Sequence, residues 1–309
     1  MPATNCTANV SRRHRFAFSS SGASVLSNRI APLGFSMKSA TSYAKDEGMN
    51  SGPWIRNEGF VIDKTAVAGS VSWNVRPAEM RWALPLILGG AFTADTIKAQ
   101  PQCPFFRIGH LDEVVSRLYT YVDCSVSKAT FSSNDAAGGL LQVALDIEAC
   151  QSTQGLASTW PAGLTLSSQQ PLVHSTSTLT LNGVARRMKD VQVVIDNQLI
   201  TDGYFNSRYR GDNPSDGQMI QLVHTSPFDD ADDLALTNLT GSVSATLVYT
   251  AGTTSLTFQF PALRYIAPEP EISGRGSRVT NQYTWEAALA TGADPSTDSP
   301  LTITLDDVL

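Results

Sequence analysis

Residues 67–90, VAGSVSWNVRPAEMRWALPLILGG, hold the two sequence patterns that decide the fold. The first half of this stretch repeats small or apolar residues at every second position, which is the spacing of a β-strand with one buried face. The alternating positions are Val67, Gly69, Val71, Trp73 and Val75. We therefore predict a strand over residues 67–75.

The second half of the stretch predicts a helix. Pro77 suits a first helical position, Glu79 lies in the first turn, and residues 80–88 are largely apolar before Gly89 supplies a stop. Pro85 lies inside this segment, and its missing N–H should kink or shorten the helix. This is the one helix that the sequence predicts clearly.

Period-two alternation recurs along the rest of the chain. Another segment has Leu111, Val114, Val115 and Leu118 at helical spacing but runs directly into a strand-like stretch, so helix and strand both stay open there. Each alternating run predicts a strand, and these runs are 119–131, 140–148, 191–195, 243–249, 254–265, 279–287 and 301–305. The chain is therefore predicted to be mainly β.

The length of 309 residues suits one large domain or two of about 150 residues. The four letters of 69–72, Gly-Ser-Val-Ser, recur at 241–244, and after each copy comes a pair of strands joined by a Ser/Gly-rich loop. We therefore predict two β domains of one fold, 1–155 with the helix near 77–88, and 156–309. The Ser/Thr/Gln-rich segment 151–170 is predicted to link them.

Charge is sparse and unevenly divided. Only 16% of the residues are charged, while Ser (33) and Thr (29) make about a fifth of the chain. The net charge of −6 argues against a protein that grips nucleic acid by its phosphates. Up to Lys189 there are 17 basic and 12 acidic side chains, a balance of +5; after it there are 5 basic and 16 acidic, a balance of −11.

The sequence offers no local motif for catalysis. There is no nucleophile elbow, phosphate-binding loop or zinc-protease motif, and the four histidines (His14, His110, His174, His224) lie in unrelated segments. The four cysteines (Cys6, Cys103, Cys124, Cys150) lack metal-ligand spacing and are predicted to be buried free thiols. We therefore expect no enzyme activity, no catalytic or metal site and no cofactor. No run reaches the length of a membrane span.

Four short segments allow a functional interpretation and a plainer one. The acidic run 229–233 has the oxygen ligands that Ca²⁺ prefers, but it lacks the pattern of an EF-hand loop, and a solvated loop is favoured. Residues 212–217 are similar and favour a turn. The Arg-Gly-Asp tripeptide 210–212 is attributed to chance. The basic arm Arg12 to Arg15 favours a protein partner over nucleic acid.

In three places the chain resembles the major tail tube proteins of long-tailed, siphovirus-like bacteriophages. The first is the strand and helix of residues 69–89. The second is the strand pair YVDCSVS at 121–127 and GGLLQV at 138–143. The third is residues 256–287, in which FPAL (260–263) and EISG (271–274) precede a closing strand.

The resemblance implies a tail-tube β-sandwich or barrel fold with a short flanking helix and long hairpins. It implies rings that stack into a tube in the virion tail, assembled in the host bacterial cytoplasm. Members with a duplicated fold form trimeric rings with a pseudo-sixfold lumen, which the length favours; a hexameric ring is the alternative. Tape measure, tail terminator and distal tail proteins are the implied partners.

DNA would pass through such a channel without specific binding, which an acidic, hydroxyl-rich lumen with few lysines suits. The chain has only six lysines, and we predict that a substantial share of the sixteen acids after Lys189 faces the lumen or the ring-to-ring contact. The alternative function is a β-sandwich binding module or adhesin of a phage tail tip or cell surface. Its mark would be exposed aromatic residues clustered on one face.

Overall fold

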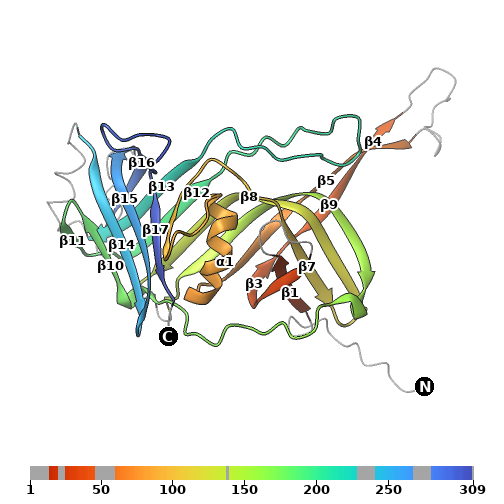
Figure 1. Cartoon of the computed structure of the whole chain (residues 1–309), viewed down its shortest axis with the longest axis horizontal. Helices are drawn as coiled ribbons and strands as arrows, with labels where there is room; N and C mark the ends of the chain where they lie inside the picture. The colour runs from red at the N-terminus through yellow and green to blue at the C-terminus, as the bar shows by residue number, and fades with distance from the viewer. Residues whose placement is uncertain are drawn as a thin grey trace, which may run out of the picture.

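A computed structural model describes residues 14–19, 25–45, 60–136, 139–227, 241–266 and 280–307. Most of this chain forms one large antiparallel sheet of 17 strands, which is not closed into a barrel (Figure 1). The mainly β fold predicted from the sequence is confirmed.

The strands, in chain order, are β1 His14–Ser19, β2 Leu26–Ile30, β3 Pro32–Phe35, β4 Lys38–Lys45, β5 Phe60–Asn74, β6 Thr96–Lys98, β7 Phe106–Asp112, β8 Arg117–Asn134, β9 Gln142–Leu156, β10 Ser177–Leu181, β11 Val184–Arg186, β12 Asp190–Asp196, β13 Met219–Pro227, β14 Val243–Ala251, β15 Thr254–Tyr265, β16 Thr280–Ala288 and β17 Thr302–Asp306. The helix α1 spans Pro77–Leu88, and two short 3-10 turns are η3 Ala157–Thr159 and η4 His174–Thr176.

Strand β8 joins the two halves of the sheet. Its first part, Arg117 to Cys124, pairs with β7, and its last part, Lys128 to Asn134, pairs with β12 on the same edge. Strand β9 runs along the other edge of β8 for nearly its whole length. The register shifts between Val126 and Lys128, where β8 passes from one neighbour to the other. Strands from both halves of the sequence therefore share one hydrogen-bonded sheet.

Helix α1 has the bounds that the sequence predicts, Pro77–Leu88. Pro85 does not shorten it, because this proline lies in the last turn and leaves only the Arg81 carbonyl without its helical partner. Gly89 ends the helix in the left-handed conformation (φ 74°) and donates its N–H to the Pro85 carbonyl at 3.1 Å. The buried face of α1 belongs to a core that also includes Trp73 of β5 and Ile303 of β17.

The structure corrects one sequence expectation and resolves one alternative that the sequence left open. The composition of Gln151 to Leu156 predicts part of a linker, but this segment continues β9 and pairs with Arg117 to Val122 of β8. Its polar composition reflects a strand whose side chains are exposed or half-buried, rather than a loop. Residues 111–118, where the spacing leaves helix and strand both open, form the end of β7, a tight turn and the start of β8.

The division into two copies of one fold, 1–155 and 156–309, stays a prediction. Strand β9 ends at Leu156, at the predicted boundary, and strand pairing between β8 and β12 crosses it. A connecting segment, residues 157–176, then leads into β10.

Two projecting features matter for function. The first, here called the arm, is the antiparallel pair of β4 with residues 60–68 of β5 (Figure 1). The second, here called the strap, is the segment 197–218 between β12 and β13, which runs along the top of Figure 1 toward β4. The strap meets the arm where the N–H of Thr65 donates to the carbonyl of Arg208 at 2.7 Å.

Candidate functional site: a polar wall

A continuous apolar row crosses six strands of the sheet. Each residue of the row lies directly opposite the next one on the neighbouring strand, and all are buried. The row is Trp73 (β5), Val143 (β9), Phe131 (β8), Val193 (β12), Leu222 (β13) and Trp285 (β16). Because side chains alternate between the faces of a strand, the neighbouring residues project from the opposite face.

That opposite face is mostly polar, and we call it the polar wall. It comprises Gln142, Ala144 and Asp146 of β9; Lys128, Thr130, Ser132 and Asn134 of β8; Asp190, Gln192, Val194 and Asp196 of β12; Met219, Gln221, Val223 and Thr225 of β13; and Gln282, Thr284 and Glu286 of β16. Amide and hydroxyl side chains make up half of it. Four carboxylates against one lysine give it a formal net charge of −3.

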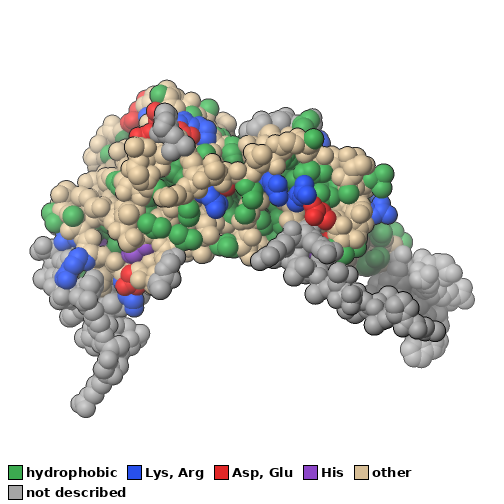
Figure 2. All heavy atoms as spheres, turned by 90° about the horizontal axis from the view of Figure 1, so that it is seen from below, with side chains coloured by type: hydrophobic (Ala, Val, Ile, Leu, Met, Phe, Trp, Pro, Cys, Tyr) green, Lys and Arg blue, Asp and Glu red, His purple; other side chains and the backbone are tan. Residues whose placement is uncertain are grey.

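The polar side chains are in register across the strands. Ser132 lies opposite Gln142 on one side and Gln192 on the other, and Val223 lies between Gln192 and Thr284. The alternation of each strand alone predicts which residues share a face, but this lateral order depends on the pairing of β8 with β12. On the face that Figure 2 shows, Lys, Arg, Asp and Glu side chains lie in small groups among uncharged ones.

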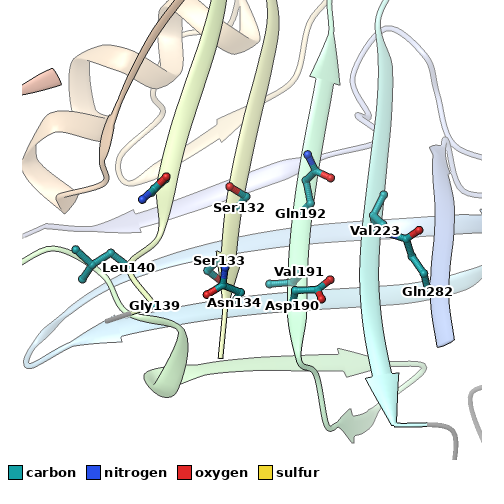
Figure 3. A pocket seen from close by; sticks show the side chains of 11 residues that line it. Ser132, Ser133, Asn134, Gly139, Leu140, Asp190, Val191, Gln192, Val223 and Gln282 are labelled. Atoms are coloured by element: carbon teal, nitrogen blue, oxygen red, sulfur yellow. The ribbon is translucent and has the colours of Figure 1, made fainter. Parts of the chain in front are cut away.

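A cavity of about 420 Å³ opens at the end of the polar wall nearest Asn134 and Asp190. Figure 3 shows Ser132, Gln192 and Gln282 rising from different strands of its lining. Asp190 accepts a hydrogen bond from the Thr225 hydroxyl at 2.6 Å, which fixes its carboxylate at the wall. The lining holds hydroxyl, amide and carboxylate groups but no histidine or cysteine, so it lacks the usual general base or soft metal ligand.

A buried hydrogen-bond chain lies beneath this end of the wall. The Ser133 Oγ is 2.8 Å from His174 Nδ1 and 2.8 Å from the Tyr249 hydroxyl. The Met188 carbonyl faces His174 Nε2 at 3.4 Å, which assigns the ring hydrogen to Nε2, so that Ser133 donates to Nδ1 and Tyr249 donates to Ser133. Burial raises the pKa of Tyr249 above its ordinary value. The chain ties β8, η4 and β14 together.

Glu79 is a buried carboxyl that the sequence did not single out as unusual. It lies in the first turn of α1 with only 3% of its surface exposed, and its Oε1 is 3.7 Å from Arg76 NH1. Burial raises its pKa to about 7, and this is opposed by the Arg76 charge and by the Trp73 indole N–H. Its place in the core, away from the polar wall, makes it a determinant of stability.

The histidines do not form a catalytic group. His14 Nδ1 and His110 Nε2 are 2.9 Å apart on β1 and β7, and burial, with the adjacent His14, lowers the pKa of His110 to about 4. His174 belongs to the chain beneath the wall, and His224 stacks on Tyr283 in the core. Within the ranges that the structure describes, no three His, Cys, Asp or Glu side chains gather as a possible metal site.

The Arg-Gly-Asp tripeptide is part of the strap, and its arginine is inaccessible. Arg210 is buried and donates through NH1 to Glu148 Oε2 at 3.0 Å and to Asn213 Oδ1 at 2.7 Å. Residues 212–217 form the returning part of the strap, in which Asp216 N–H donates to the Gln198 carbonyl. Arg210 thus holds the strap against β9 and is not displayed to a receptor.

Other sequence candidates have simple outcomes. Cys124 and Cys150 are buried free thiols and Cys103 is a half-buried one, whereas Cys6 lies outside the described residues. Arg15 of the basic segment 12–15 pairs with Glu113. Arg12 and Arg13 lie outside the described residues, as does the acidic run 229–233. None of the helices that the structure describes is long and apolar enough to cross a membrane.

Comparison with known proteins identifies a family for this chain. A family model described as phage tail tube protein matches residues 27–287, which include all of the polar wall and α1. No curated protein matches the sequence. The match covers most of the chain and confirms the resemblance seen in the sequence. The chain therefore belongs to the phage tail tube proteins, a family of structural components of the virion tail.

Proposed function

We propose that the chain polymerises into rings that stack into the tail tube, and that the polar wall lines the channel through which DNA is ejected. The observation that carries this proposal is the contrast between the two faces of the same strands. One face carries the buried apolar row and packs into the core to which α1 also belongs. The other face is a polar surface with a formal charge of −3.

The chemistry of the polar wall suits passage of DNA without specific binding. Carboxylates repel phosphates. Uncharged amides and hydroxyls carry no positive charge that could displace the counterions of the DNA phosphates. Three of the sixteen acids after Lys189 lie on the wall, namely Asp190, Asp196 and Glu286. We propose that these three face the channel. The six acids at 229–233 and at 269 and 271 lie outside the described residues.

Self-association is supported by the arm and the tip of the strap. On the arm Tyr43, Val61 and Ile62 are 56%, 61% and 43% exposed, and on the strap Phe205 is 77% exposed. Among the described pairings β4 has β5 as its only neighbour, so its second edge offers unpaired N–H and C=O groups. Exposed apolar groups beside a free strand edge favour burial against another copy of the chain.

The trimeric ring with a pseudo-sixfold lumen is our preferred assembly, with two units at 1–155 and 156–309, and a hexameric ring is the alternative. The tape measure, tail terminator and distal tail proteins are the proposed partners, and assembly is proposed to take place in the host cytoplasm. The mass of one ring distinguishes the two: three chains of 33.1 kDa give about 99 kDa and six give about 199 kDa.

Electron microscopy of the purified chain tests the polymerisation. We expect rings or tubes, and their abundance should fall when the exposed Val61 and Ile62 of the arm are both replaced by Asp. A chain that stays strictly monomeric at high concentration would contradict the proposal. The binding-module alternative expects exposed aromatic residues clustered on one face. Trp73 and Trp285 instead lie in the core, and the exposed Tyr43 and Phe205 lie on the arm and the strap.

A further inference from the structure

We infer that Asp146 and Asp196 neutralise Lys128, the one base of the polar wall, and so keep this lysine from holding DNA phosphates during passage. This inference rests on the proposed function, because it assumes that the polar wall meets DNA. Beyond their contribution to the net charge, these two carboxylates weaken the binding of DNA phosphates to Lys128 in the channel.

The strand register places Lys128 between the two acids. Lys128 on β8 lies directly opposite Asp196 on β12 and directly opposite Asp146 on β9. Directly opposite residues of antiparallel strands have Cβ atoms about 5 Å apart on the same face of the sheet. The row continues with Ser70 on β5 and Met219 on β13, which are uncharged. Lys128 therefore has a carboxylate on each side and no second base in its row.

Backbone contacts fix the Asp196 carboxylate and the strand position of Asp146. The Asp196 Oδ1 accepts the N–H of Gln198 at 2.9 Å. The next residue, Asn197, is buried and donates through Nδ2 to the carbonyls of Ile87 and Val126 at 3.0 and 2.9 Å. On the other side, Ser127 Oγ donates to the Asp146 carbonyl at 3.0 Å. The irregularity between Val126 and Lys128 is thus braced on both sides of β8.

The same arrangement recurs at the edge of the wall. Arg264 of β15 lies directly opposite Glu286 of β16, and both side chains are exposed. A cation beside a fixed carboxylate attracts a phosphate less, because the phosphate is repelled by the carboxylate at nearly the distance at which it is attracted by the cation. Lys128 and Arg264 therefore share this pattern. The reduction in phosphate attraction is larger at Lys128, which has two acidic neighbours.

The test is the double substitution Asp146→Asn and Asp196→Asn, which keeps size and shape but leaves Lys128 without its acidic neighbours. A matched control, Asp202→Asn with Asp216→Asn, makes the same change of charge at two exposed positions of the strap. Binding of a short fluorescent DNA duplex to the unassembled chain is measured by anisotropy at low and moderate salt. A third variant adds Lys128→Gln to the double substitution.

We expect the double variant to bind the duplex roughly tenfold more tightly than the control at low salt, with one additional phosphate contact in its salt dependence. Adding Lys128→Gln should return binding to the control level. Equal binding by the double variant and the control would overturn the inference. Because the unassembled chain is used, this result is independent of tube formation, which microscopy of the unchanged chain tests separately.

Discussion

At the scale of single residues, Glu79 makes stability depend on pH. Its pKa in the folded chain is about 7, above the ordinary 4.5, so the folded state binds the proton more tightly than the unfolded state does. The corresponding stability is complete below pH 4.5 and is lost as the pH rises through 7. We predict that between pH 5 and pH 8 the free energy of unfolding falls by on the order of 2 kcal/mol through this group.

The substitution Glu79→Gln checks this prediction by urea unfolding across that pH range. The glutamine side chain has nearly the same shape and no charge, so the variant should keep its stability at pH 8 and exceed the unchanged chain there. At pH 5 the two should be nearly equal. Asp202→Asn, an exposed acid of the strap, should retain the pH dependence. If Glu79→Gln loses stability in parallel with the unchanged chain, the buried carboxyl is not the cause.

At the scale of elements, the strap depends on Arg210. This residue connects the strap to β9 through Glu148 and braces the strap internally through Asn213. Removing a buried, charge-assisted hydrogen-bond donor costs about 1.5 to 3 kcal/mol and leaves its acceptors unpaired. The loss should be local, because the base of the strap is held separately by Asn197.

We therefore predict that Arg210→Ala speeds tryptic cleavage after Arg208 by at least about tenfold, since local opening of the strap becomes that much more frequent. Mass spectrometry of the fragments over time gives the rate. Asp216→Ala, an exposed position of the same strap, should leave cleavage after Arg208 almost unchanged. Similar rates for both variants would show that Arg210 does not hold the strap.

At the scale of the whole molecule, local sequence patterns predicted the elements that short-range interactions determine, namely individual strands and the helix. Alternation located the inner parts of β5, β9 and β12, and the change of period located α1 from Pro77 to Leu88. Gln151 to Leu156 could not be recognised as a strand, because this end of β9 has exposed or half-buried side chains on both faces and so has no apolar alternation. The burial of Arg210 could not be predicted from the sequence, because its partner Glu148 lies 62 residues away along the chain.

The polar wall was only partly foreseen for a similar reason. The excess of acids after Lys189 pointed to Asp190, Asp196 and Glu286, but Asp146 and Lys128 come from the basic half of the sequence. They join the wall because β8 pairs with β12, and this pairing of distant segments has no local signature. The charge balance along a chain therefore indicates the sign of the charge on a surface, but not which residues form that surface.

The central claim is that the polar wall faces the channel of an assembled tube. A cryo-electron-microscopy reconstruction of tubes made from the purified chain tests it most directly. We predict that Ser132, Gln192 and Asp146 line the lumen, that α1 lies on the outer side of the sheet, and that the lumen carries net negative charge. A reconstruction in which these three residues lie on the outer surface of the tube, or a lumen with net positive charge, would contradict the claim.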